Sequence, residues 1–114
     1  MKTSLKLVLV AGAALAAPII VRGATAQVTW TKDCQKCHSA DGSASGPMGK
    51  KLNLKNYTDP AVQAAMTDDE IIKAIKEGAK DEKTGKQTMP AGASKYSDEE
   101  VIALKDFVRG LKKG

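Results

Sequence analysis

Cys34-Gln35-Lys36-Cys37-His38 is the most informative segment of this 114-residue chain. The pattern C-x-x-C-H is typical of a site where a c-type haem is attached covalently. On one helical turn, two cysteines three residues apart lie on the same face, so both thiols reach the edge of one flat macrocycle. The next residue offers an imidazole nitrogen to the iron from one side. The pentapeptide therefore predicts a haem held by Cys34 and Cys37 as thioethers and by His38 as the proximal axial iron ligand.

Other interpretations of this pentapeptide compete with haem attachment. A thioredoxin-type dithiol belongs at the end of a strand in a βαβ unit, and the sequence has no strand–helix alternation. A zinc site needs four ligands, whereas this chain has two cysteines and one histidine. A disulfide between Cys34 and Cys37 would close too small a loop to stabilise the fold much. Haem attachment is favoured, with a dithiol and a metal site as the alternatives.

The first 26 residues have the layout of a secretory signal peptide. Two lysines precede an uncharged, almost wholly apolar run over residues 7–21, and Ala24-Thr25-Ala26 places small residues where a signal peptidase reads. These 15 apolar residues are few for a membrane span. We expect residues 1–26 to be removed on export, leaving residues 27–114 as one domain in the periplasm or another extracytoplasmic compartment. Cleavage after Ala16, or retention as an N-terminal membrane anchor, is the alternative.

Charge and composition narrow the class of protein further. The net charge of +5 falls to +2 when the basic residues of the first 26 positions are removed, so nucleic-acid binding loses its support. Aromatic residues make up only 4% of the chain. A domain this short buries only a modest fraction of its surface, so it usually needs a crosslink or a bound group to stabilise it. A haem among aliphatic side chains would supply the missing core volume.

Helical patterns dominate the remaining sequence. Residues 67–70 (TDDE) and 97–100 (SDEE) each have the pattern of a capping box, and an apolar helical face follows each one. The first face comprises Ile71, Ile72, Ile75 and Ala79, with Gly78 as the stop. The second comprises Val101, Leu104, Val108 and Leu111, widened by Ile102 and Phe107. Shorter helices are predicted from Asp59, with Pro60 at its first position, to about Met66, and over residues 28–36.

Two long loops separate these predicted helices, at residues 39–56 and 80–96. The first is rich in Gly, Ser and Asn, the second is rich in Gly and Lys, and neither shows β alternation. Loops of this length are uncommon inside a compact domain unless they surround a ligand. The sequence therefore predicts an all-α domain folded around its cofactor.

The second iron ligand must come from elsewhere, because His38 is the only histidine. A methionine, a lysine or an open site remains. Met89, followed by Pro90, stands in the second loop, which is long enough to cross the opposite haem face. Met48 lies in the loop after His38, and Met66 ends an apolar run where packing is the ordinary role of methionine. Met89 is therefore the predicted distal axial ligand, and His/Met ligation raises the reduction potential.

The chain resembles the small mono-haem class I cytochromes c, a family of soluble electron carriers. Over residues 27–114 it has the family's C-x-x-C-H, then a Met-Pro pair at 89–90, then an amphipathic closing helix over 97–112. The resemblance implies a cytochrome c-like fold of three to four helices around one covalently attached haem c. It also implies that the first and last helices cross at Trp30, Leu104 and Phe107.

The resemblance also concerns the loop that follows His38. It implies that the carbonyl of Pro47 accepts the Nδ1 proton of His38, which fixes the ring and makes the imidazole more basic. Two features depart from the family pattern. Cleavage after Ala26 leaves seven residues before Cys34, so the first helix is shorter than usual. No tryptophan follows the first loop to meet a haem propionate, which leaves Tyr57, Asn53 and Asn56 as candidates.

The function predicted from these features is one-electron transfer by a monomeric carrier that is not an enzyme. Its partners would be redox proteins that donate and accept electrons, including membrane-bound respiratory or dehydrogenase complexes with acidic docking surfaces. Lysines at positions 50, 51, 55, 80, 83 and 86 flank the two loops and would steer such partners, or form an ordinary solvated surface. The alternatives are a haem-based sensor or ligand-binding protein with a displaceable Met89, and a thiol oxidoreductase with Cys34 as nucleophile.

Overall fold

The structure is a computed structural model that describes residues 19–113, with side chains from residue 24 onward. The first 18 residues, which hold most of the predicted signal peptide, lie outside the described residues. The helices and strands, in chain order, are α1 (Ile19–Thr29), the π-helical turn η1 (Trp30–Cys34), α2 (Gln35–His38), α3 (Pro47–Lys51), α4 (Pro60–Ala65), α5 (Asp68–Glu77), β1 (Ala79–Lys80), β2 (Gln87–Met89) and α6 (Asp98–Gly110). None of the described helices is long and apolar enough to span a membrane.

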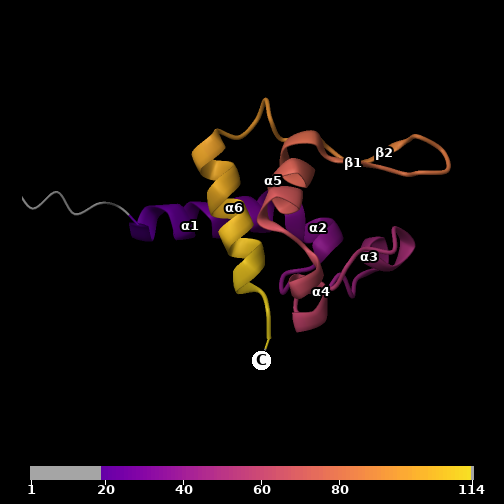
Figure 1. Ribbon diagram of the computed structural model, residues 1–114, viewed down its shortest axis with the longest axis horizontal. Coiled ribbons are helices and arrows are strands. Elements are labelled where there is room, and N and C mark those ends of the chain that lie inside the picture. The colour runs from indigo at the N-terminus through magenta and orange to yellow at the C-terminus, as the bar shows by residue number, and fades with distance from the viewer. Residues whose placement is uncertain (1–18, 114) are drawn as a thin grey trace, which may run out of the picture.

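Helix α6 crosses the helical segment formed by α1 and η1, and the hydrophobic core lies at this crossing (Figure 1). The rings of Trp30 and Phe107 meet there with their centroids 5.2 Å apart. Trp30 and Leu104 are both buried. The predicted contact between the first and last helices at these three residues is therefore confirmed.

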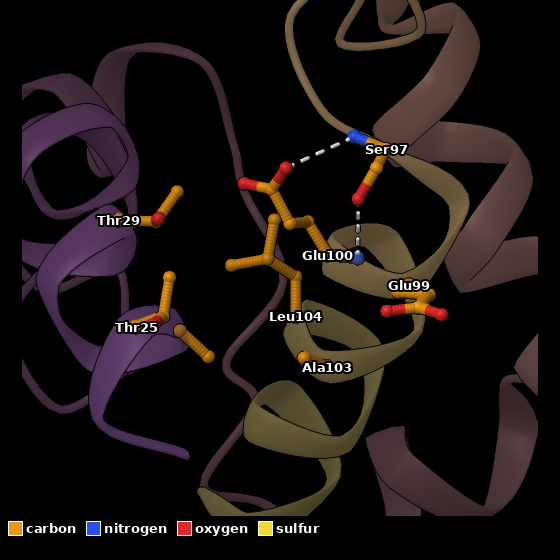
Figure 2. A pocket seen from close by; sticks show the side chains of 8 residues that line it. Thr25, Thr29, Ser97, Glu99, Glu100, Ala103 and Leu104 are labelled. Carbon is orange, nitrogen blue, oxygen red and sulfur yellow. Dashed lines mark hydrogen bonds between the residues drawn. The ribbon is translucent and has the colours of Figure 1, made fainter. Parts of the chain in front are cut away.

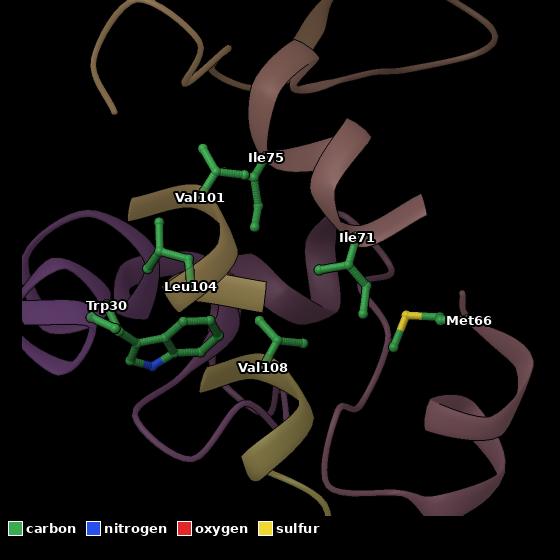
Figure 3. Close-up of a cluster of buried hydrophobic side chains, with 8 residues drawn as sticks. Trp30, Met66, Ile71, Ile75, Val101, Leu104 and Val108 are labelled. Carbon is green, nitrogen blue, oxygen red and sulfur yellow. The ribbon is translucent and has the colours of Figure 1, made fainter. Parts of the chain in front are cut away.

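The rest of the core extends from this crossing toward α5 and the end of α4. Figure 3 shows the side chains of α6 lying between Trp30 and those of α5. The buried apolar side chains here are Val101, Leu104, Val108, Ile71, Ile75 and Met66. Each fully buried aliphatic side chain contributes roughly 1.5–3 kcal/mol relative to an exposed one. The packing role predicted for Met66 is confirmed.

The predicted starts of α4, α5 and α6 are confirmed, whereas the first helix, predicted over residues 28–36, begins at Ile19 and continues through η1 and α2 to His38. The Ser97 hydroxyl accepts a hydrogen bond from Glu100 N (3.1 Å), and the Glu100 carboxylate accepts one from Ser97 N (3.2 Å), which completes the capping box of α6. Thr67 caps α5 by accepting a hydrogen bond from Glu70 N at 3.1 Å, but the predicted return bond from the Glu70 carboxylate is not formed, so only half of this capping box is present. Asp59 caps α4, and α5 ends at Gly78 with φ of +74°. Local side-chain chemistry therefore sets these boundaries.

Both predicted loops contain regular structure that the sequence interpretation missed. Pro47 opens the short helix α3, where its fixed φ suits the first helical position. In the second loop β1 and β2 pair antiparallel, with Ala79 opposite Met89. Asp81 closes the hairpin, because its side chain accepts hydrogen bonds from the amides of Lys83 and Thr84. Strands of two and three residues are too short to show alternation.

Two side chains assigned to apolar helical faces lie elsewhere. Ala79 follows the helix stop at Gly78, so it is an exposed residue of β1 and not part of the α5 face. Ile102 is 45% exposed, because it lies one position beyond the buried Val101 and turns toward solvent. The apolar stripe of α6 is therefore narrower than predicted.

Candidate functional site

The three predicted attachment residues come together where the first helical segment ends. Cys34 is the last residue of η1, while Cys37 and His38 end α2. Both thiols are free and partly buried. The π-helical turn before them was not predicted, although such turns are frequent at functional sites. Within residues 19–113, no group of three or more His, Cys, Asp or Glu side chains is arranged to hold a metal ion.

His38 lies between two aromatic rings. Its ring centroid is 5.7 Å from that of Trp30 and 5.4 Å from that of Tyr57, which stacks on it at an interplanar angle of 25°. Burial lowers the pKa of the imidazole. Tyr57 was a candidate for a propionate partner, and its stacking on the histidine was not foreseen. The two rings restrict the orientation of His38.

The Nδ1 atom of His38 is buried and has no hydrogen-bond partner, the only such side-chain atom in the described part of the chain. The bond predicted from Nδ1 to the carbonyl of Pro47 is therefore not formed. The reason is that Pro47 opens α3, where the carbonyl of a first residue is directed at the amide four positions later. An iron ion would bind the other ring nitrogen, Nε2, and two free thiols precede this histidine in the same turn. These residues fit a covalently attached haem.

The environment of Cys34 disfavours thiol chemistry. Burial, with the negative charge of Asp33 beside it, raises the pKa of the Cys34 thiol to about 11. A nucleophilic cysteine in a disulfide oxidoreductase needs the opposite shift, because the thiolate is the reactive species. This shift argues against the thiol oxidoreductase alternative.

Met89 lies on a separate segment, as the last residue of β2, and it is half-buried. Its carbonyl accepts a hydrogen bond from the Gln87 side chain at 2.9 Å. The strand passes so close to Gly78 that a Cβ there would lie 2.1 Å from the Met89 carbonyl oxygen. Met48, the other loop methionine, lies half-buried in α3. Met89 is therefore held at a fixed place against the end of α5.

A contact connects the C-x-x-C-H turn to the segment that follows Met89, and it involves neither His38 nor Met89. Tyr96, in the segment after β2, donates its hydroxyl proton to Asp33, the residue before Cys34, at 2.6 Å. The sequence interpretation missed this pair, because nothing in a single sequence links positions 63 residues apart. The acidic residue beside the first cysteine was the only available signal.

A groove between α1 and the start of α6 lies away from these residues. Figure 2 shows Thr25 and Thr29 on one side and Glu100 and Leu104 on the other. The Glu100 carboxylate is engaged by the backbone amide of Ser97. None of the predicted haem residues lines this groove, so it belongs to the helix crossing.

This arrangement of helices around a C-x-x-C-H turn defines a small class I cytochrome c. Residues 22–108 match the family described as "Cytochrome C oxidase, cbb3-type, subunit III", and the chain belongs to that family. The predicted all-α, cytochrome c-like fold is confirmed, with the β1–β2 hairpin as an addition. Membership implies haem c as the cofactor and haem-based electron transfer as the function.

Two solved structures support this assignment. The chain is similar to the KustC0563 c-type cytochrome at 32% identity with a TM-score of 0.66, covering 77% of this chain and 98% of that one. The structure of a Kustc0563 mutant, in which one tyrosine is replaced by phenylalanine, gives 31% identity and a TM-score of 0.64, covering 76% and 98% of the two chains. None of the curated proteins compared with the chain matches it.

Proposed function

We propose that the protein is a one-electron carrier, not an enzyme, which holds one haem c through Cys34, Cys37, His38 and Met89. The observation that carries the proposal is the C-x-x-C-H turn, in which two free thiols precede a histidine whose ring lies between Trp30 and Tyr57. When bound, the haem iron supplies a reversible ferrous–ferric couple. Cys34 and Cys37 would hold the macrocycle as thioethers, and His38 and Met89 would be the two protein ligands of the iron.

The chain's own residues have separate tasks in this proposal. Trp30 and Tyr57 restrict the His38 ring, so the imidazole needs little reorganisation between the two oxidation states. The thioether of Met89 favours ferrous iron and raises the reduction potential. If the protein supplies both iron ligands, no substrate would bind at the iron. The protein would thus transfer electrons without performing bond chemistry.

Spectroscopy of methionine variants tests the ligand set. The oxidised wild-type protein should show a sulfur-to-iron charge-transfer band, and the reduced protein should bind little carbon monoxide at neutral pH. Met89→Leu should lose the band and bind carbon monoxide while the haem stays covalently attached on a denaturing gel. Met48→Leu is the matched control and should keep the band. A wild-type protein that lacks the band and binds carbon monoxide readily would favour the sensor alternative.

We further propose export to the periplasm or another extracytoplasmic compartment, supported by the signal-peptide layout of residues 1–26. Ala26, the last residue of that segment, is 3% exposed and belongs to the core cluster beside Trp30. Cleavage after Ala26 would remove this side chain, whereas cleavage after Ala16 or retention as an anchor would keep it. The intact mass of the protein recovered from its native compartment distinguishes the three. Recovery from the cytoplasm with free thiols would contradict export.

The proposed partners are redox proteins with acidic docking surfaces, including respiratory complexes of the kind named in the family description. Lys50 and Lys51 of α3 and Lys80, Lys83 and Lys86 of the hairpin are exposed. Figure 1 shows α3 and the hairpin extending to the same end of the molecule. Such a group of lysines speeds the encounter with an acidic partner, mostly at low salt. Electron-transfer rates that do not change with ionic strength would contradict this steering.

A further inference from the structure

Asp33 is the centre of a small charged cluster that connects two distant parts of the chain. Its Oδ2 atom accepts a hydrogen bond from the Tyr96 hydroxyl at 2.6 Å and lies 3.0 Å from Lys95 Nζ. The side chain of Asp33 is only 18% exposed. Hydrogen bonds to an ionised carboxylate are roughly twice as strong as neutral ones. The Asp33 cluster, formed by these three residues, is thus a specific contact.

The two sides of this cluster belong to the two sides of the proposed haem site. Asp33 lies in η1 and directly precedes Cys34, which would be bonded to the haem. Tyr96 is the last residue before the Ser97 cap of α6, in the segment that follows Met89 and Pro90. The cluster therefore connects the attachment turn to the segment that carries the distal ligand.

The segment between Met89 and α6 is fixed to α5 by backbone hydrogen bonds, so a displacement at Tyr96 affects its other residues. Gly92 N donates to the carbonyl of Ile75 at 2.9 Å, and Ala93 N donates to that of Lys76 at 3.1 Å. Tyr96 N donates back to the Gly92 carbonyl at 2.8 Å. A Cβ on Gly92 would lie 2.7 Å from both the Ile75 oxygen and the Tyr96 ring, so ring, turn and α5 are in close contact. Displacement of Tyr96 would therefore disturb the chain next to Pro90.

We infer that Asp33 and Tyr96 are positioning residues that hold the Met89 segment in place across the haem, so that the distal ligand is hard to displace. Lys95 supports the same carboxylate from the solvent side, where it is 55% exposed and more weakly coupled. The inference rests on the proposed ligation by Met89. Without the cluster, the segment would open locally more often while the haem stays attached.

Two conservative variants test the inference. Tyr96→Phe removes only the hydroxyl group, and Asp33→Asn keeps the shape of the side chain but removes its charge. Both should retain covalent haem on a denaturing gel. The reduced variants should bind carbon monoxide on the order of tenfold faster than the wild type, the change expected when one charge-assisted hydrogen bond is lost. The sulfur-to-iron charge-transfer band of the oxidised variants should disappear at a lower temperature.

Two controls separate positioning from a general loss of stability. Asp98→Asn makes the same charge change at the start of α6, where Asp98 pairs with Lys76 at 2.9 Å. Ser97→Ala removes the adjacent helix cap and lowers the overall stability. Both controls should bind carbon monoxide at the wild-type rate at room temperature. Equal rates for Tyr96→Phe, Asp33→Asn and a wild type that shows the band would overturn this inference alone, whereas a wild type without the band would overturn it together with the Met89 proposal.

Discussion

The indole N–H of Trp30 lies 3.1 Å from the carbonyl oxygen of Ser39 and also donates to that of Ala40, at 3.2 Å. Ser39 directly follows His38 and has φ of +70° and ψ of 161°, a conformation almost confined to glycine. Such a backbone costs of order 1–3 kcal/mol and persists only where the surrounding structure holds it. The side chain of Trp30, at the crossing of the helices, therefore holds the strained turn after His38.

Replacing Trp30 by phenylalanine should destabilise this turn. Phenylalanine keeps an aromatic ring beside Phe107 but lacks the N–H, so two carbonyls lose their donor. The lost hydrogen bond and the smaller ring together should lower the free energy of unfolding by about 2–4 kcal/mol. Denaturant unfolding of the haem-loaded protein measures this loss. Phe107→Leu disturbs the same crossing without touching the turn and is the control. Only Trp30→Phe should also change the haem absorption spectrum.

Replacing Ser39 by glycine should stabilise the protein. Glycine adopts a positive φ without steric cost, which relieves the strain at this position. The variant loses a weak acceptor, because the Ser39 hydroxyl accepts from Gly46 N at 3.3 Å. The net gain in unfolding free energy should be about 1 kcal/mol. Ser39→Ala loses the same hydroxyl but keeps the Cβ, so it should be less stable than the wild type. If both variants lose stability equally, the turn is not strained.

Replacing Gly78 by alanine should displace the strand that carries Met89. The new Cβ would lie 2.1 Å from the Met89 carbonyl oxygen, so the strand must move away from α5. The oxidised variant should therefore show a weaker sulfur-to-iron band. Gly85→Ala is the matched control, since Gly85 has φ of +71° and a Cβ placed there would have no atom within 4 Å. That control should cost about 1–2 kcal/mol for its left-handed backbone and leave the band intact.

The sequence allowed those parts of the fold to be predicted that depend on neighbouring residues or on one strong pattern. The caps at Thr67 and Ser97 act within one turn, and the apolar stripe of α6 fixes its buried face. The contact of Trp30 with Phe107 required the family resemblance. The C-x-x-C-H turn could be predicted because its residues are consecutive, and the role of Met89 as ligand stays a prediction.

The remaining features depend on tertiary contacts that a single sequence does not record. The π-helical turn before Cys34 shifts the helical register without any glycine or proline to mark it. The hairpin before Met89 depends on an Asp81 side chain that binds backbone amides. The pairing of Asp33 with Tyr96 joins segments 63 positions apart. The predicted bond between Pro47 and His38 failed because α3 directs the proline carbonyl elsewhere.

Arg109 of α6 connects three elements through one guanidinium group. Its Nη atoms donate to the carbonyls of Gln63 and Met66, both at 2.6 Å, and its Nε donates to the Asp68 carboxylate at 2.8 Å. These contacts join the end of α4 and the start of α5 to the closing helix. The planar fork of arginine suits such a set of acceptors, and lysine cannot reproduce it. Arg109→Lys should therefore lower the free energy of unfolding by about 1–3 kcal/mol, measured by denaturant unfolding.

The pH dependence of stability should reflect the same contact. The hydrogen bond from Arg109 lowers the pKa of Asp68 below its ordinary value. A carboxylate with a lower pKa in the folded state stabilises the protein above the unfolded pKa of about 3.9, and this contribution is lost as the pH falls through the folded pKa. Asp68→Asn should therefore be less stable than the wild type at neutral pH, and the difference should shrink in acid. Unfolding free energies under both conditions, measured also in the Arg109→Lys background, test this. If Asp68→Asn lowers the free energy of unfolding as much in the Arg109→Lys background as it does in the wild type, Asp68 acts through another group.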